Sequence, residues 1–329
     1  MEQNILLSIM AIIIGFGALV WGAERFVHGA AAIANNFGVA PLIIGLTIVG
    51  IGTSAPEILI SLIAAYQGNP SLAVGNALGS NIANIALVLG ITAIVMPLSV
   101  RSETLRREYP IMFVVMLLAL VLVLDNYLGQ IDGLILISGL FVMTYWMIRV
   151  GKKQQLDPKL DPMEAEFEQE IPDIPTKQAI LWFIVGLVLL IVSSRGLVWG
   201  SVNIAKAAGI SDLVIGLTIV AVGTSLPELA ASIMSALKKE PDIAIGNIIG
   251  SNMFNMLVVF GIPGVMAPHI IDTIIINRDF AFMIGLSVAL FIMAYGFKGR
   301  AGRINRFEGS LLLVGYFAYM SVLYYTAVA

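Results

Sequence analysis

Residues 45–90 read GLTIVGIGTSAPEILISLIAAYQGNPSLAVGNALGSNIANIALVLG, and residues 216–261 read GLTIVAVGTSLPELAASIMSALKKEPDIAIGNIIGSNMFNMLVVFG. The second stretch follows the first at a constant offset of 171 residues, and 22 of the 46 aligned positions are identical. Chance similarity between apolar helices matches Leu, Ile and Val, whereas this match is densest at Gly, Thr, Ser, Pro, Glu and Asn. The chain therefore contains a duplicated unit whose polar residues carry the similarity.

The composition around this repeat is that of a membrane protein. Of the 329 residues, 59% are hydrophobic and 12% are charged, whereas soluble domains have roughly 25% charged residues. The 18 Lys+Arg and 21 Asp+Glu leave a net charge of −3, with no basic surplus for nucleic acid. Because there is no cysteine and there are only two histidines, disulfides, thiolate chemistry and multi-histidine metal sites are excluded. We expect an all-α polytopic membrane protein that is not an enzyme and has no cofactor.

Ten stretches are long and apolar enough to cross a bilayer, which takes about 20 residues per helix. The first five are expected near 5–27, 41–66, 71–96, 109–126 and 131–149. The second five are expected near 178–200, 212–237, 241–267, 279–297 and 309–327.

An acidic stretch at residues 151–176 separates the two hydrophobic halves. It contains seven acids, three lysines and four prolines, a composition typical of a flexible linker. The chain is therefore predicted to comprise a five-helix half at 1–150, the linker, and a second five-helix half at 177–329. Because five is an odd number, the second half enters the membrane from the opposite side. Such inverted repeats are typical of secondary transporters, with ion sites near the bilayer midplane.

The basic residues predict how the chain is oriented. If successive loops alternate between the two sides, 15 of the 18 Lys+Arg lie on one side. That side is expected to face the cytoplasm. Both termini are then predicted on the outer side of the cell (inner) membrane, with the acidic linker in the cytoplasm. The N-terminus does not have the basic start of a signal peptide, so we expect the first helix to be retained.

The first repeated motif, GTSxPE, places an acid in the middle of an apolar span. It reads GTSAPE at residues 52–57 and GTSLPE at residues 223–228. A charged side chain at the bilayer centre costs roughly 2.5–3.5 kcal/mol on insertion scales. Glu57 and Glu228 therefore need a bound cation, a proton or a partner. The alternative is a protonated, hydrogen-bonded core glutamate, which is less attractive because the acid recurs in both repeats.

Each glutamate follows a proline that is expected to break its helix. Pro56 and Pro227 lack an N–H, so carbonyls one turn earlier lose their hydrogen-bond donor. Broken backbone at membrane depth is tolerated only where it is buried or lines a cavity. The motif hydroxyls lie three or four residues before each glutamate, on the same helix face. Helix packing is their alternative role, but inside this repeated motif we favour ion binding by Thr53, Ser54, Thr224 and Ser225.

The second motif, GNxxGSNxxN, adds hydroxyls and amides at residues 75–84 and 246–255. A serine and an asparagine lie one turn apart in each copy, and they face the same way. Amides and glycines at this spacing can also serve helix packing. Two further amide pairs, Asn76 with Asn247 and Asn81 with Asn252, are left without a role. The preferred ligands in this motif are Ser80, Asn84, Ser251 and Asn255.

These groups share one chemistry, since all of them offer oxygen. Sites built only of oxygen suit calcium, sodium or magnesium rather than copper, zinc or nickel. A large, flexible set of neutral and anionic oxygens favours calcium, which takes 6–8 ligands. Two negative charges balance one divalent or two monovalent ions. The same oxygens can therefore serve two competing cations, which is the condition for exchange.

The paired motifs in two five-helix halves resemble the cation/calcium exchanger superfamily, and in particular its prokaryotic sodium/calcium exchangers. The resemblance implies four ion sites between the second, third, seventh and eighth helices, with Glu57 and Glu228 as central carboxylates. The Thr and Ser residues of both motifs and Asn84 would complete these sites. The backbone carbonyls of Gly50 and Ala221 would flank them. Asn255 departs from members that have an aspartate there, including potassium-dependent exchangers, and this argues against potassium dependence.

The resemblance also implies that the first and sixth helices slide across the remaining bundle. Glycines on these two helices suit a sliding face, although they equally suit static packing. They are Gly22, Gly29, Gly196 and Gly200.

Several functions remain open at this point. The first is an antiporter that moves calcium against sodium by alternating access. A second is a proton/calcium antiporter on the same scaffold, and a third is a cation channel. A nucleotide-driven pump is disfavoured because no G-x-x-x-x-G-K-[ST] loop is present. The expected partners are calcium ions, sodium ions and the lipid bilayer, with no nucleic acid and no nucleotide.

Overall fold

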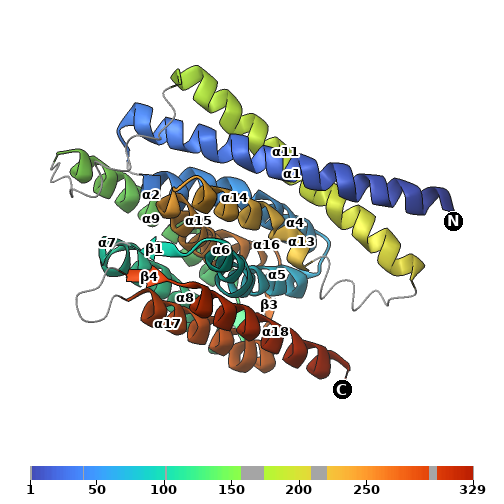
Figure 1. The fold of residues 1–329 in the computed structure, drawn as a ribbon. Helices are drawn as coiled ribbons and strands as arrows, with labels where there is room; N and C mark the ends of the chain where they lie inside the picture. Colours follow the sequence, from blue (N-terminus) through green and yellow to red (C-terminus); the bar gives the residue numbers. More distant parts are fainter. Residues whose placement is uncertain are drawn as a thin grey trace.

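The computed structural model describes residues 2–39, 41–100, 102–156, 174–208, 221–295 and 302–328. These residues form a bundle of helices with four very short strands, as the composition predicts. Two long helices, α1 and α11, cross on one side of the bundle (Figure 1). Most of the predicted linker lies outside the described residues.

The first half of the chain contains two helices interrupted by π-helical turns. Its elements are α1 (Glu2–Phe37), α2 (Pro41–Ile44), η1 (Gly45–Val49), α3 (Gly50–Thr53), α4 (Ala55–Tyr66), α5 (Pro70–Ala83), η2 (Asn84–Val88), α6 (Leu89–Val95), β1 (Leu98–Val100), α7 (Ser102–Arg106), α8 (Glu108–Leu122), β2 (Tyr127–Leu128) and α9 (Gln130–Leu156).

The second half repeats much of this order. Its elements are α11 (Thr176–Ala207), α13 (Ala221–Thr224), α14 (Leu226–Leu237), α15 (Pro241–Phe254), η5 (Asn255–Val259), α16 (Gly261–Met266), β3 (His269–Ile270), η6 (Ile275–Phe280), α17 (Ala281–Ala294), β4 (Gly302–Ile304) and α18 (Arg306–Val328).

The described residues include six helices that are long and apolar enough to cross a membrane. A seventh span is formed if Gly45–Thr53 and Ala55–Tyr66, which meet at a 51° bend, are counted together. The predicted count of ten is therefore not confirmed. Helix α8 has only 15 residues, about 22 Å at 1.5 Å per residue, and the start of the predicted span at 212–237 lies outside the described residues. The first helix ends at Phe37, ten residues later than predicted.

The strands link the two halves in matching ways. Strand β1 pairs antiparallel with β4, so that Leu98 lies opposite Ile304. Strand β2 pairs antiparallel with β3, so that Leu128 lies opposite His269. Equivalent residues of the two repeats are 171 positions apart for β1 and β3, and 176 positions apart for β2 and β4 and for the last helix of each half. Applying these offsets turns the first pairing into the second, so the same contact is made twice.

Helices α1 and α11 pack through glycines in the same symmetrical manner. A Cβ added at Gly15 would lie 3.1 Å from Leu197 of α11, and one added at Gly186 would meet the backbone of Phe26 of α1. These two contacts exchange under the offset of 171. Residue numbers rise along one helix as they fall along the other, so the pair is antiparallel. The glycines therefore join α1 to α11 closely, and both helices form one packing unit.

Glycines that the sequence assigned to a sliding face divide into two kinds. A Cβ at Gly29 would lie 2.5 Å from the Phe183 nitrogen, and one at Gly200 would lie 2.6 Å from the Ser8 carbonyl oxygen. Gly22 also approaches α11, whereas no atom lies within 4 Å of a Cβ added at Gly196. Three of the four, Gly22, Gly29 and Gly200, therefore permit the close packing of α1 on α11, and Gly186 does the same.

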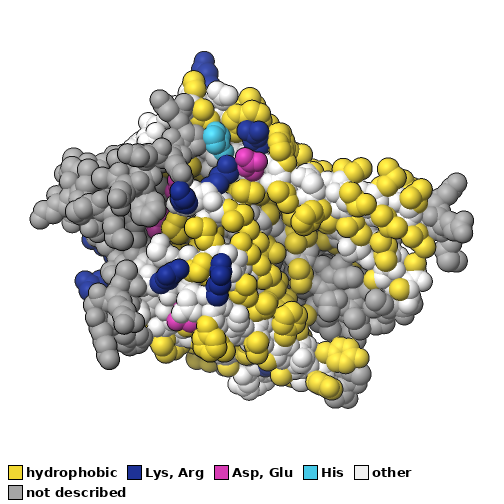
Figure 2. Space-filling view, viewed as in Figure 1, with side chains coloured by type: hydrophobic (Ala, Val, Ile, Leu, Met, Phe, Trp, Pro, Cys, Tyr) yellow, Lys and Arg dark blue, Asp and Glu magenta, His cyan; other side chains and the backbone are white. Residues whose placement is uncertain are grey.

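The ends of the bundle differ in charge. Both termini lie at the same end (Figure 1). On the face shown in Figure 2, lysine and arginine side chains gather toward the opposite end, while hydrophobic side chains cover the middle. This distribution is the one expected of a protein that is surrounded by lipid and has one positively charged end.

Candidate cation-binding site

The GTSxPE motif breaks its helix in both halves, as predicted. Helix α3 ends at Thr53, and Ser54 adopts φ −80° and ψ 5° before α4 begins. Ser225 takes nearly the same conformation, φ −89° and ψ 6°, ahead of α14. In each case proline occupies the first turn of the new helix, where its missing N–H costs nothing. Glu57 and Glu228 therefore lie in the first turn of a helix that starts inside the bundle.

The GNxxGSNxxN motif ends in a π-helical turn in both halves. Helix α5 gives way to η2 at Asn84, and α15 gives way to η5 at Asn255. Single π turns within α-helices are rare and are frequent at functional sites. The sequence did not predict these turns, because one extra residue per turn leaves an apolar pattern almost unchanged.

Most of the predicted ligands are buried. Glu57, Glu228, Asn84 and Ser225 are each 1% exposed, although they are polar or acidic. Thr224 is half-buried and has interactions of its own, and Ala221 begins α13. The remaining predicted ligands, all buried, are Gly50, Thr53, Ser54, Ser80, Ser251 and Asn255.

The first half's broken helix meets the second half's GNxxGSNxxN helix. Thr53 donates a hydrogen bond from Oγ1 to Asn247 Oδ1 at 2.9 Å. Its hydroxyl also lies 3.4 Å from the hydroxyl of Ser251, and Ser251 donates to the Gly50 carbonyl oxygen at 3.4 Å. A Cβ at Gly250 would collide with the backbone of Leu46, so only glycine permits this approach.

The two glutamates lie together at this junction. The carboxyl groups are close enough for their charges to interact. Glu228 accepts a hydrogen bond at Oε1 from Ser54 Oγ at 3.3 Å, and the Ser80 hydroxyl is a hydrogen-bonding neighbour of Glu57. Both repeats thus contribute a carboxylate, and the hydroxyls that contact the two carboxylates come from the first repeat.

Several oxygens of this cluster have no hydrogen-bond partner among the described residues. They are Oε2 of both glutamates, Oδ1 of Asn84, Oδ1 of Asn255 and Oγ of Ser225. A buried polar group without a partner is costly, and native proteins rarely leave one unsatisfied. Five such oxygens in one buried cluster, two of them on carboxylates, fit a place that a cation occupies.

Two asparagines that the sequence left without a role support the glutamates. Asn76 donates to the Glu57 carbonyl oxygen at 3.1 Å, and Asn247 donates to the Glu228 carbonyl oxygen at 3.4 Å. Asn247 also donates to Ser232 Oγ at 3.1 Å. The matching pair fixes the backbone of both glutamates from the neighbouring helix.

The donor set fits a hard cation. The described residues contain no group of three or more His, Cys, Asp or Glu side chains that could hold a metal. A cation at this cluster would therefore meet two carboxylates and otherwise neutral hydroxyl, amide and carbonyl oxygens. Calcium and sodium accept such ligands, whereas softer metals prefer nitrogen and sulfur.

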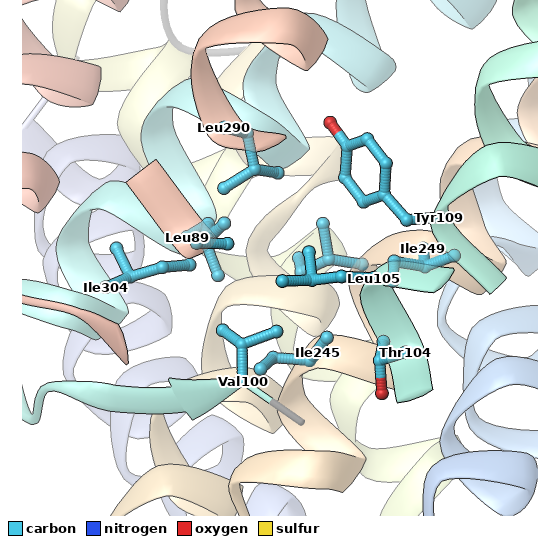
Figure 3. A pocket seen from close by; sticks show the side chains of 11 residues that line it. Leu89, Val100, Thr104, Leu105, Tyr109, Ile245, Ile249, Leu290 and Ile304 are labelled. Carbon is cyan, nitrogen blue, oxygen red and sulfur yellow. The ribbon is translucent and has the colours of Figure 1, made fainter. Parts of the chain in front are cut away.

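Two hollows elsewhere in the protein are not part of this cluster. A pocket of about 20 Å³ lies among apolar side chains such as Leu89, Leu105 and Ile249, with Tyr109 at its edge (Figure 3). An open groove of about 700 Å³ runs between α8 and α9 and is lined by side chains including Val115 and Trp146. Neither hollow is lined by a predicted ion ligand.

Comparison with known proteins agrees with this arrangement. The model of the sodium/calcium exchanger protein family matches residues 7–149 and 178–325. The chain is 46% identical over 320 residues to the putative antiporter CaxA of Alkalimonas amylolytica, covering 97% of this chain and 99% of that protein. It is 39% identical to the inner membrane protein YrbG of Escherichia coli K12, covering 97% and 98%. The solved structure of the sodium-calcium exchanger NCX_Mj superposes with a TM-score of 0.82 at 31% identity, covering 97% and 99%.

The fold and the buried cluster define a membrane transporter for small cations. The chain belongs to the sodium/calcium exchanger protein family. It is accordingly a multi-helix membrane protein of the cation/calcium antiporter class, and this class consists of exchangers rather than enzymes.

Proposed function

We propose that this protein exchanges sodium for calcium across the cell membrane by alternating access. The observation that carries the proposal is the pair of buried carboxylates, Glu57 and Glu228, at equivalent positions of the two repeats. Each has a carboxylate oxygen without a hydrogen-bond partner among the described residues. The two charges can be balanced by one calcium ion or by two sodium ions, so each ion can displace the other.

The ion ligands that we propose are those predicted from the sequence. The carboxylates of Glu57 and Glu228 are central, and hydroxyl, amide and carbonyl oxygens complete the coordination. These are Thr53, Ser54, Ser80, Asn84, Thr224, Ser225, Ser251 and Asn255, with the backbone of Gly50 and Ala221.

Sodium is preferred to protons as the counter-ion because of the neutral ligands. Hydroxyl and amide oxygens complete the coordination of a sodium ion, whereas a proton on a carboxylate needs no such set of ligands. NCX_Mj, which has a similar fold, is described as a sodium-calcium exchanger. A proton/calcium antiporter is the second candidate, since the same two glutamates could bind protons instead.

We propose ten spans in two inverted five-helix repeats, at 1–150 and 177–329, joined by the linker at 151–176. The duplicated contacts between β1 and β4 and between β2 and β3 support this arrangement, as do the exchanged glycine contacts of α1 and α11. An antiparallel pair of equivalent helices is what a two-fold axis in the membrane plane generates. The basic end would face the cytoplasm, with both termini on the outer side.

Alternating access is supported by a difference between the two repeats at the ion site. The strand pairs, the α1/α11 contacts and the asparagine bonds to the glutamate backbone occur twice, but the hydroxyl bond to the glutamate side chain does not. Ser54 donates to Glu228 Oε1, whereas the equivalent Ser225 hydroxyl has no partner among the described residues. The contacts between the two halves are symmetric, whereas the hydrogen bonds at the ion site are not. A carrier that alternates between two mirror-related states is expected to show this combination.

The test is uptake of radiolabelled calcium into sodium-loaded proteoliposomes. Uptake should require internal sodium and should be lost in Glu228→Gln, which removes the charge but retains the volume. Glu308→Gln is the matched control, because Glu308 only accepts a hydrogen bond from the Asn305 N–H at an exposed helix start. Uptake that follows a pH gradient and ignores sodium would favour proton coupling. Uptake that requires neither gradient would refute antiport.

A further inference from the structure

Asn81 and Asn252 are buried beside the cluster but are not among the proposed ligands. Both are 0% exposed, and they occupy equivalent positions in the two GSN triplets. Each uses its amide nitrogen to contact a methionine of the opposite half. Asn81 Nδ2 lies 3.5 Å from Met283 Sδ, and Asn252 Nδ2 lies 3.9 Å from Met112 Sδ. Asn81 Nδ2 also donates to the Asn252 carbonyl oxygen at 3.2 Å. Because both amide nitrogens are directed to these partners, each Oδ1 faces the other way.

The orientation of the Asn252 amide fixes the orientation of the Asn84 amide. Asn252 Oδ1 accepts a hydrogen bond from Asn84 Nδ2 at 3.2 Å. Because its nitrogen is occupied, Asn84 must turn its Oδ1 to the other side, and that oxygen has no partner among the described residues. Asn252 therefore makes Asn84 present an oxygen to the cluster rather than an N–H, which would repel a cation.

In the second half, the equivalent bond is not made. Its two atoms would be Asn255 Nδ2 and Asn81 Oδ1. Each is buried and has no hydrogen-bond partner among the described residues. One atom is a donor and the other is an acceptor, so they match each other. The same pair of groups therefore occurs twice between the halves, and it is bonded in one copy and open in the other.

We propose that Asn252 and Asn81 are positioning residues that act in turn. In the access state of this structure, Asn252 orients the ligand Asn84. In the opposite state, Asn81 accepts from Asn255 and orients it, while the Asn84–Asn252 bond opens. The Ser54–Glu228 bond and the unpartnered hydroxyl of the equivalent Ser225 follow the same pattern. This inference rests on the proposed exchange function and adds that each state uses one correctly oriented amide.

A double-mutant cycle separates positioning from general packing. Asn252→Ala should raise the KM for calcium about threefold to tenfold, as expected for loss of one orienting hydrogen bond, with a smaller change in kcat. In an Asn84→Ala background, the same substitution should have no further effect on KM, since the residue that it orients is gone. Effects that multiply instead would overturn the proposal.

The sidedness of the effect tests whether the two asparagines act in turn. KM should be measured in right-side-out and in inverted membrane vesicles. Asn252→Ala should raise KM on one face of the membrane and Asn81→Ala on the other. Equal effects of either variant on both faces would overturn the alternation.

A second variant keeps the test decisive if Asn252→Ala does not fold. Met112→Leu conserves volume and removes only the sulfur that accepts from Asn252. It should raise KM about twofold on the same face as Asn252→Ala, and an unchanged KM would count against the proposal. Failure of the exchange function itself would be seen differently, as wild-type vesicles that show no sodium-dependent calcium uptake.

Discussion

The close contact between α1 and α11 can be tested with a single methyl group. In Gly29→Ala, the new Cβ would lie 2.5 Å from the Phe183 nitrogen and 2.7 Å from the Ala179 carbonyl oxygen. Ordinary van der Waals contact begins near 3.4 Å, so the shortfall at the nitrogen is about 0.9 Å. Both obstructing atoms belong to the backbone of α11 and cannot turn away like a side chain. The helices must therefore separate along their shared face.

The magnitude follows from two opposing effects. Overpacking a tight interface typically costs about 1–3 kcal/mol. Replacing glycine by alanine in a helix returns about 0.5–1 kcal/mol. We therefore expect Gly29→Ala to lower the free energy of unfolding by about 1–2 kcal/mol. The matched control is Gly17→Ala in the same helix, where no atom lies within 4 Å of the added Cβ, so only the favourable effect remains.

Thermal unfolding in detergent, followed by tryptophan fluorescence, measures both variants. Trp21 and Trp182 lie edge to face across this interface with ring centroids 6.2 Å apart, and the Arg25 guanidinium lies over both rings. Three of the four tryptophans lie on α1 and α11, so the fluorescence reports mainly on these two helices. Gly29→Ala should melt below the wild type and Gly17→Ala at or above it. Equal melting temperatures for the two variants would refute the reasoning.

Three further predictions concern the periphery of the bundle. Tyr319 donates a hydrogen bond to the buried Asp279 at 2.9 Å. Tyr319→Phe should therefore lower the free energy of unfolding by about 1.5–3 kcal/mol, as expected for a bond to a charged group. In the same thermal assay, Tyr325→Phe should have no such effect, because Tyr325 is exposed. Lys238 and Glu24 form an ion pair at 3.3 Å with both side chains partly exposed, so Lys238→Gln should cost about 0–1 kcal/mol, and a loss that persists in 1 M salt would contradict this. Burial lowers the pKa of His269, in strand β3, below its ordinary value of 6.5. Because the folded state thus favours neutral His269, its stability should be full above about pH 6.5 and should fall as the pH drops below that value; His269→Gln should flatten this part of a melting-temperature profile against pH.

The sequence predicted the parts of the site that depend on local rules. Pro56, four residues after the conformationally free Gly52, must interrupt the helix, and the structure has a 51° bend there. Hydroxyls and acids spaced by one turn share a helix face, so the clustering of Thr53, Ser54 and Glu57 followed from spacing alone. The match between the halves at residue types that rarely agree by chance placed the second motif beside the first.

Other features depend on long-range geometry that the sequence does not express. The strands are two or three residues long and pair across more than 140 positions, so no local pattern marks them. The π turns at Asn84 and Asn255 add one residue to an apolar run without altering its appearance. Which way an amide faces depends on its neighbours, so the roles of Asn76 and Asn247 required the structure. The number of spans remains a prediction.

The duplicated contacts between the halves have a consequence for the origin of the chain. Each is an isologous contact, in which a surface meets its own copy, as in a symmetric homodimer. Two separate chains, each equivalent to one half, could form the same strand pairs and the same glycine-packed helix pair, provided that they inserted into the membrane in opposite orientations. An ancestor of this kind would need Lys and Arg balanced between its two ends. The charge bias of the present chain would then have followed gene fusion, once each copy had a fixed orientation.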